Sequence, residues 1–312
     1  LLSLSQVVRD NSAEFIRHVH GSHVVRTLLH VLGGCLGPPR TEARPVCSDL
    51  YKNHLKGNLV DLALHPIANF PIQRLTAASA KYKLVGDVLL MSTEPKSSLL
   101  GIILILFQFL QFLRLFDELV EGVESVLAAG HMGVIVQLAE SCAESGEKQD
   151  EMMRCLLNVP LTSICYHGSR LVQALAKFKE RSHLLSSLRT LSPADLLTMA
   201  SDPSGSHVLQ ALITTSSDKG RGKILKRLEV HVHGLYRFGQ YVQMACSKLG
   251  SRVLEAVWNS ASVSQRQSIA QELGKADCYA LSAPEQLGTF HRQTQRCRYA
   301  SLIGQTLCYV VI

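Results

Sequence analysis

Apolar residues along most of this chain recur every three or four positions, the spacing that gives an α-helix one buried face. In the clearest segment, Val208, Leu209, Leu212 and Ile213 follow this spacing directly after the break at residues 202–205 (DPSG). No stretch alternates apolar and polar residues over the length of a strand. The pattern therefore predicts helices throughout, separated by short breaks.

One helix–break–helix pattern occurs several times in the sequence. Residues 197–211 (LTMASDPSGSHVLQA) align without a gap with residues 242–256 (VQMACSKLGSRVLEA), and the match includes the Gly-Ser pair and the apolar pair after it. With the shorter copies, second helices are expected to begin near residues 22, 69, 133, 169, 206 and 251. Two-helix units of about 36 residues stack into an α-solenoid. The predicted fold class is therefore all-α, a curved superhelix of such units.

Two segments carry the residues of a helix N-terminus. Ser192 precedes Pro193 and stands three positions before Asp195, which is typical of a capping box with proline at the first helical position. Asn58 stands three positions before Asp61 in the same way. We expect the first helix of a repeat to begin at each of these caps.

The repeats are expected to form one array over residues 6–274. Within it, residues 92–116 break the register, and we interpret them as a divergent insertion or a degenerate repeat. Their apolar part, residues 99–116 (LLGIILILFQFLQFLRLF), contains glutamines and an arginine and lacks a polybasic flank, which favours a buried helix over a membrane span. Residues 275–312 lose the pattern and are expected to form a divergent C-terminal segment.

The composition argues against several classes of protein. With 46% apolar and 18% charged residues, the chain has enough material for a folded core. The nine cysteines stand singly and form no CxxC pair, so a reducing compartment is expected, with neither a disulfide framework nor a zinc ribbon. No phosphate-binding loop, GxSxG or HExxH motif occurs, so we expect no catalytic residue, no cofactor and no metal.

The net charge of +7 is unevenly distributed. Acidic residues prevail over residues 117–151, where Lys148 is the only lysine or arginine, and basic residues prevail over residues 219–256. A polyanion is therefore expected to bind mainly to the last third of the chain. The acidic part leaves an alternative open, a solenoid that binds a protein partner and reads no base.

The residues after each break resemble the repeats of Pumilio (PUF) proteins. In that family the second helix exposes two side chains, four positions apart, that contact the edge of one base, and a third that stacks between bases. The segments GSHVVRTLL, HPIANFPIQRL, DPSGSHVLQALI and GSRVLEAVW are similar to the nucleolar branch of this family, the nucleolar protein nine group. That group has more repeats than are visible in this sequence, which implies an incomplete or alternatively spliced chain.

The resemblance identifies candidate RNA-binding side chains in each repeat. The first and second edge residues are the pairs Ser22/Arg26, Asn69/Gln73, Gly133/Gln137, Ser169/Gln173, Ser206/Gln210 and Ser251/Glu255, and the stacking residues are His23, Phe70, Arg170, His207 and Arg252. Val134 stands at the stacking position of the remaining repeat. In the family, Asn with Gln suits uracil, Ser with Glu suits guanine, and Ser with Gln is closer to the adenine-reading type.

The function that the resemblance implies is RNA binding without catalysis. We expect single-stranded or partly structured precursor ribosomal RNA as the ligand, and pre-ribosomal small-subunit assembly proteins as further partners. The group is a scaffold of small-subunit biogenesis that restrains premature cleavage of the precursor RNA. Localisation to the nucleolus is expected with it, and no membrane association.

Overall fold

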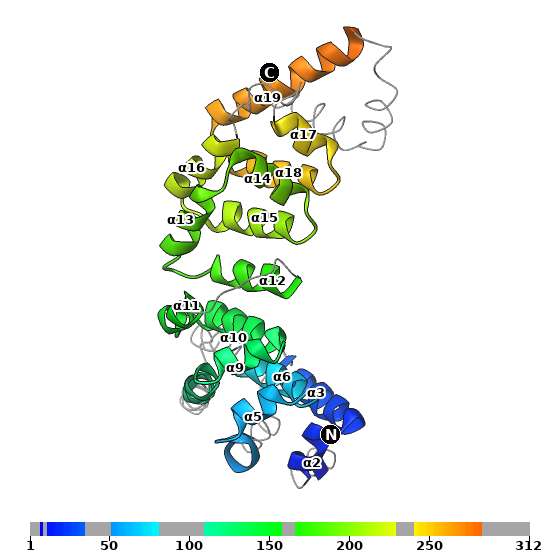
Figure 1. Cartoon of the computed structure of the whole chain (residues 1–312), viewed down its shortest axis with the longest axis vertical. Coiled ribbons are helices and arrows are strands. Elements are labelled where there is room, and N and C mark those ends of the chain that lie inside the picture. The colour runs from blue at the N-terminus through cyan, green and yellow to red at the C-terminus, as the bar shows by residue number, and fades with distance from the viewer. Residues whose placement is uncertain are drawn as a thin grey trace, which may run out of the picture. The chain divides into compact units, whose positions relative to one another are not determined.

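The computed structural model describes residues 7–8, 11–34, 51–80, 109–157, 166–228 and 240–282. These residues form helices, turns and short connections, and no strand occurs among them (Figure 1). The predicted all-helical solenoid is confirmed. The chain divides into two compact units, unit 1 (Leu1–Ser163 with Phe178–Glu180) and unit 2 (Ile164–Lys177 with Arg181–Ile312).

Unit 1 is built around three long helices that pack side by side. Its helices are α2 (Ser12–Arg17), α3 (Val19–Gly34), the π-helix η1 (Tyr51–Leu55), α5 (Leu59–Leu64), α6 (Asn69–Ala80), a helix over residues 109–120, α9 (Val123–Ala128), α10 (Met132–Ser145) and α11 (Gln149–Leu157). The second helices of the predicted repeats are α3, α6 and α10, and α6 contacts both of the others. The short helices α2, α5 and α9 are the first helices that precede them.

Unit 2 repeats the same arrangement. Its helices are α12 (Tyr166–Leu175), α13 (Ser182–Thr190), α14 (Pro193–Ser201), α15 (Gly205–Thr215), α16 (Asp218–Leu228), α17 (Gln240–Cys246), α18 (Gly250–Ser260) and α19 (Val263–Ser282). The second helices α12, α15 and α18 pack in that order (Figure 1). A third helix follows a second helix here: α16 packs on α14 and α15, and α19 packs on α17. The predicted two-helix unit omitted this third helix.

The glycine at the break is required by a close approach of two helices. A Cβ atom on Gly205 would lie 2.6 Å from the carbonyl oxygen of Met199, and one on Gly250 would lie 2.7 Å from that of Met244. A Cβ atom on Gly21 would likewise lie 2.6 Å from the carbonyl oxygen of Phe15. The second helix therefore begins against a backbone carbonyl of the first helix, and the glycine of the motif has a structural role.

The predicted caps have different outcomes. Ser192 and Asp195 form the expected capping box, with Pro193 inside the first turn of α14. Asn58 occupies the N-cap position of α5 as expected, but its side chain makes no cap hydrogen bond. The first amide of α5, at Leu59, donates instead to the carboxylate of Glu118 at 2.8 Å. A side chain that is distant in the sequence has taken the role of the local cap.

The apolar segment is described from residue 109 onward. The helix over residues 109–120 buries Phe112, Leu115, Phe116 and Leu119, as expected for a buried helix. Residues 92–108 of the predicted insertion and residues 283–312 of the predicted C-terminal segment lie outside the described residues. None of the described helices is both long enough and apolar enough to cross a membrane.

Candidate nucleic-acid interface

The second helices present the candidate stacking residues to solvent. In unit 2, His207 and Arg252 are exposed and Arg170 is half-buried, at the same register position of three adjacent helices. In unit 1, His23 is exposed, and Phe70 remains 45% exposed although its helix is otherwise largely buried. Each unit therefore carries a row of flat or cationic side chains on neighbouring second helices.

In unit 1, a cation–π contact joins two candidate residues of adjacent repeats. The guanidinium carbon of Arg26 lies 5.2 Å from the centre of the Phe70 ring, so a second edge residue of α3 covers the stacking residue of α6. This distance is within the range of a cation–π contact. The contact joins side chains of two adjacent repeats on this surface.

The repeat of α10 departs from the pattern. Val134, at the stacking position, is 1% exposed, and Ile135 and Val136 are equally buried. Gly133 and Gln137, its candidate edge residues, are half-buried. This repeat therefore offers no side chain for stacking.

The first edge residues are turned into the helix stack. The five with side chains are between 1% and 9% exposed: Ser22, Asn69, Ser169, Ser206 and Ser251. Each donates a hydrogen bond to a backbone carbonyl; in four of them the acceptor is three residues earlier, as in Ser22 to Val19 at 2.8 Å and Ser251 to Lys248 at 3.0 Å. The second edge residues Arg26, Gln73, Gln173 and Gln210 are half-buried, and Glu255 is exposed. The second edge residues are therefore the more accessible members of the pairs.

Hydrogen bonds join the two members of several edge pairs. The Gln73 amide donates to Asn69 Oδ1 at 3.1 Å, and the Gln173 amide donates to Ser169 Oγ at 3.0 Å. The Gln210 amide donates to the backbone oxygen of Ser206 at 3.1 Å. These contacts follow from the helix, because residues four positions apart lie one turn apart on the same face.

Adjacent repeats are also coupled at the edge residues. A Cβ atom on Gly133 would lie 2.8 Å from Nε2 of Gln73, so the missing side chain in α10 leaves space for the glutamine of α6. In unit 2, the Ser169 hydroxyl donates across to the carbonyl of Ser204 at 2.7 Å. The sequence pattern did not reveal these contacts, because each depends on how neighbouring repeats are packed.

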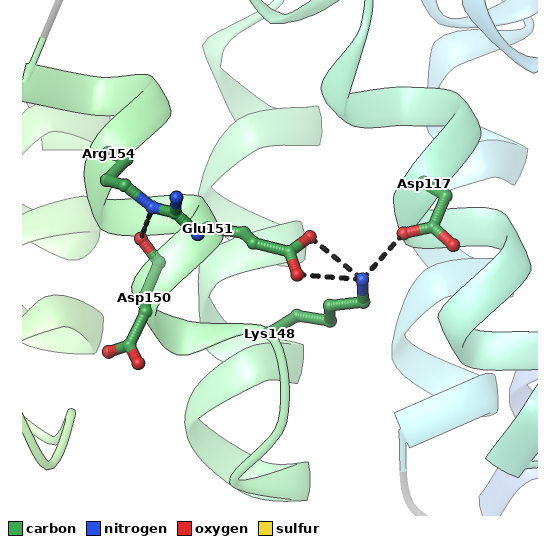
Figure 2. A network of polar contacts seen from close by, with 5 residues as sticks. All are labelled: Asp117, Lys148, Asp150, Glu151 and Arg154. Carbon is green, nitrogen blue, oxygen red and sulfur yellow. Dashed lines mark hydrogen bonds and ion pairs between the residues drawn. The ribbon is translucent and has the colours of Figure 1, made fainter.

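Lys148, in the acidic segment 117–151 of unit 1, forms ion pairs with carboxylates of the same segment. Lys148 Nζ lies 2.9 Å from Asp117 Oδ1 and 2.8 Å from Glu151 Oε2 (Figure 2). Hydrogen bonds from Lys148 to Glu151 and Asp117 raise the pKa of the lysine. Carboxylates therefore already neutralise this cation. Among the described residues, no group of three or more histidine, cysteine, aspartate or glutamate side chains is placed to hold a metal ion.

Helical repeats of this kind, with candidate edge and stacking residues on the second helix, define an α-solenoid of the Pumilio type. The solved structure of APUM23 with its insert region deleted and GGAAUUGACGG shares this fold, with a TM-score of 0.63 at 16% identity over 96% of this chain and 57% of that one. The model of the NOP9-like PUF repeat domain matches residues 40–160 and 159–278. The chain therefore belongs to the NOP9-like PUF repeat family.

Two curated relatives agree with this assignment. Nucleolar protein 9 of Mus musculus is 33% identical over 285 residues, which cover 75% of this chain and 39% of the mouse protein. Nucleolar protein 9 of Homo sapiens is 32% identical over 311 residues, which cover 84% of this chain and 42% of the human protein. The chain thus spans about two fifths of the length of these relatives.

Proposed function

We propose that this chain binds single-stranded or partly structured RNA through its second helices. The accessible candidate stacking residues in each unit carry the proposal: His23 and Phe70 in unit 1, and Arg170, His207 and Arg252 in unit 2. Aromatic rings, imidazoles and guanidinium groups stack on any nucleobase, and cations among them also attract phosphates. Membership of the NOP9-like PUF family and the uridine-containing sequence GGAAUUGACGG in the name of the APUM23 structure support the same ligand class.

The biological setting of the proposal comes from the relatives. Their name, nucleolar protein 9, supports residence in the nucleolus. We propose precursor ribosomal RNA as the ligand, small-subunit assembly proteins as partners, and a scaffold role that restrains premature cleavage. Sedimentation of the full-length protein with small-subunit precursors tests this setting, and exclusive residence in the cytoplasm would contradict it.

The binding surface can be tested with a triple variant. Replacing Arg170, His207 and Arg252 with alanine should weaken binding of a labelled single-stranded RNA, since each lost stack costs about 1–3 kcal/mol. Helical content should remain, because none of the three side chains is buried. Mobility of the RNA across a salt series measures the effect, and the unmodified chain should lose affinity steeply as salt rises.

A matched control separates stacking from charge. Lys223 and Lys226 are exposed on the third helix α16, and replacing both with alanine removes the same formal charge as the two arginine substitutions. This double variant should lose only a salt-sensitive fraction of the affinity. Equal affinity of the triple variant and the unmodified chain would show that RNA is bound elsewhere.

One observation favours a second function for unit 1. Residues 117–151 carry nine aspartates and glutamates against one lysine, and that lysine, Lys148, is already paired with Asp117 and Glu151. Such an acidic surface repels phosphates and suits a basic protein segment. If the chain does not retard the labelled RNA even at low salt, binding of a protein partner by unit 1 would explain its function better than RNA binding.

A further inference from the structure

Tyr166, the first residue of α12, is an exposed aromatic residue outside the positions that the repeat pattern assigns to RNA. Its side chain is 66% exposed, and it stands three positions before the first edge residue Ser169. Among the phenylalanine, tyrosine and tryptophan side chains that the structure describes, the only other exposed one is Phe70. Phe70 is itself a candidate stacking residue, so both exposed rings lie on second helices.

The position of Tyr166 makes its exposure informative, since a single exposed apolar side chain is ordinary on a protein surface. Tyr166 and the candidate stacking residue Arg170 are four positions apart, so they share one face of α12 and lie about one turn apart. Helical side chains lean toward the N-terminus of their helix, which directs Arg170 toward the turn that contains Tyr166. The tyrosine ring therefore continues the candidate interface by one turn.

The ring is also restrained by its neighbour in the sequence. The rings of Tyr166 and His167 have their centres 5.4 Å apart and their planes at 77° to each other. This edge-to-face geometry is one of the favourable arrangements of two aromatic rings. A side chain that is already held loses less conformational entropy when a ligand covers it. The contact thus prepares the ring for stacking.

The equivalent positions on the neighbouring second helices suit a nucleic acid. They are occupied by Pro203 before α15 and Lys248 before α18, and both side chains are exposed. The adjacent carboxylate, Asp202, accepts hydrogen bonds at 2.8 and 2.7 Å from two backbone amides at the start of α15. A flat ring beside cationic side chains is the combination that binds single-stranded nucleic acid, because the ring stacks on bases and the cations attract phosphates.

We infer that Tyr166 stacks on one nucleobase of the bound RNA. The inference rests on the proposed RNA binding and adds a contact outside the register of the edge and stacking residues. Every base has a π-face, so a tyrosine ring stacks on any of them. Tyr166 therefore contributes affinity without base choice, and α12 contributes two stacking groups, Tyr166 and Arg170.

Unit 1 offers a matched control at the same register position. Val19 is the first residue of α3, precedes His-Gly-Ser as Tyr166 does, and is 51% exposed. It is apolar but has no ring, so Val19→Ala should leave the affinity for RNA unchanged. At position 166 itself, Tyr166→Phe keeps the ring and should bind as the unmodified chain does. Tyr166→Leu keeps apolar volume without a π-face and should behave as Tyr166→Ala.

The experiment measures the affinity of each variant of the full chain for an RNA that the unmodified chain selects from a randomised single-stranded pool. Tyr166→Ala and Tyr166→Leu should bind about 5- to 150-fold more weakly, the fold-change for one lost base–aromatic stack. The same RNA is then synthesised with an abasic nucleotide at each position in turn. One abasic position should weaken binding by the unmodified chain and by Tyr166→Phe, and cause no further loss in Tyr166→Ala or Tyr166→Leu.

Several outcomes would overturn the inference. Unchanged affinity of Tyr166→Ala would leave a protein partner as the group that covers the ring. Full affinity of Tyr166→Leu would indicate apolar contact without stacking, and a loss in Tyr166→Phe would indicate a hydrogen bond from the hydroxyl. An abasic scan in which every position affects all variants equally would also overturn it.

Two controls keep the result interpretable. Helical content should be unchanged in Tyr166→Ala because the ring is exposed; if it falls, Tyr166→Leu decides the test, since leucine has a high helix propensity. Failure of the unmodified chain to bind any RNA would overturn the proposed function itself. Binding that depends on Arg170, His207 and Arg252 but not on Tyr166 would overturn this inference alone.

Discussion

Gly205→Ala tests the packing that defines the repeat. The new Cβ atom would lie 2.6 Å from the carbonyl oxygen and 2.8 Å from Cγ of Met199, whereas ordinary van der Waals contacts begin near 3.4 Å. The oxygen belongs to the backbone of α14 and cannot rotate away, so α14 or α15 must shift by most of an ångström. Overpacking of this kind costs about 1–3 kcal/mol, and the rigid neighbour places this variant near the upper end. Gly250→Ala should behave in the same way, since its Cβ atom would meet Met244.

Gly222 provides a control, because its replacement by alanine should raise the free energy of unfolding where that of Gly205 lowers it. It lies inside α16, and a Cβ atom there would meet nothing within 4 Å. Gly222→Ala should therefore stabilise the chain by about 0.5–1 kcal/mol, because alanine loses less backbone entropy in a helix. Urea unfolding followed by the helical circular dichroism signal measures both free energies. Equal unfolding free energies for Gly205→Ala and the unmodified chain would refute the packing argument.

Two further predictions concern titratable groups. Hydrogen bonds from the Ser192 hydroxyl and backbone lower the pKa of Asp195, so their stabilisation should be complete above the ordinary aspartate pKa and disappear as pH falls through the lowered value. Ser192→Ala should therefore cost more unfolding free energy at neutral pH than in strong acid, where only the bond from the Asp195 amide to the Ser192 hydroxyl remains to be lost; a constant difference across pH would contradict this. Burial raises the pKa of the Cys142 thiol to about 12, so Cys142 should resist alkylation until the chain unfolds. Mass spectrometry of pulse-labelled protein checks this, and labelling in the folded chain at the rate of a free thiol would contradict it.

The repeat and its helices were predictable because their causes are local. Helical spacing of apolar residues such as Val208 and Leu212 requires only that one face be buried, and the Ser192–Asp195 capping box involves residues three positions apart. The glycine of the break was visible as a recurring letter. Its physical reason, a backbone carbonyl at 2.6 Å from a Cβ atom on Gly205, required the structure.

The third helix was missed because its local signals are weak. The sequence of α16, DKGRGKILKRL, contains two glycines, which lower its helix propensity, and five lysines and arginines, which leave few apolar positions to bury. Its burial of Ile224, Leu225 and Leu228 becomes favourable only when α14 and α15 are already in place. Tertiary packing has here overridden a poor local propensity.

In the candidate site too, some features follow from the sequence and others depend on tertiary packing. The resemblance to Pumilio repeats placed the candidate stacking residues His207 and Arg252 at one register position of adjacent second helices, and both are exposed there. Spacing could not show that Ser169 is buried or that its hydroxyl donates to Ser204, 35 residues later. Such bonds depend on the distance between two helices, and that distance is set by the side chains of both repeats together. The sequence by itself thus determined which residues share a face of each second helix, and the tertiary structure decided which of them stay exposed and which are buried between repeats.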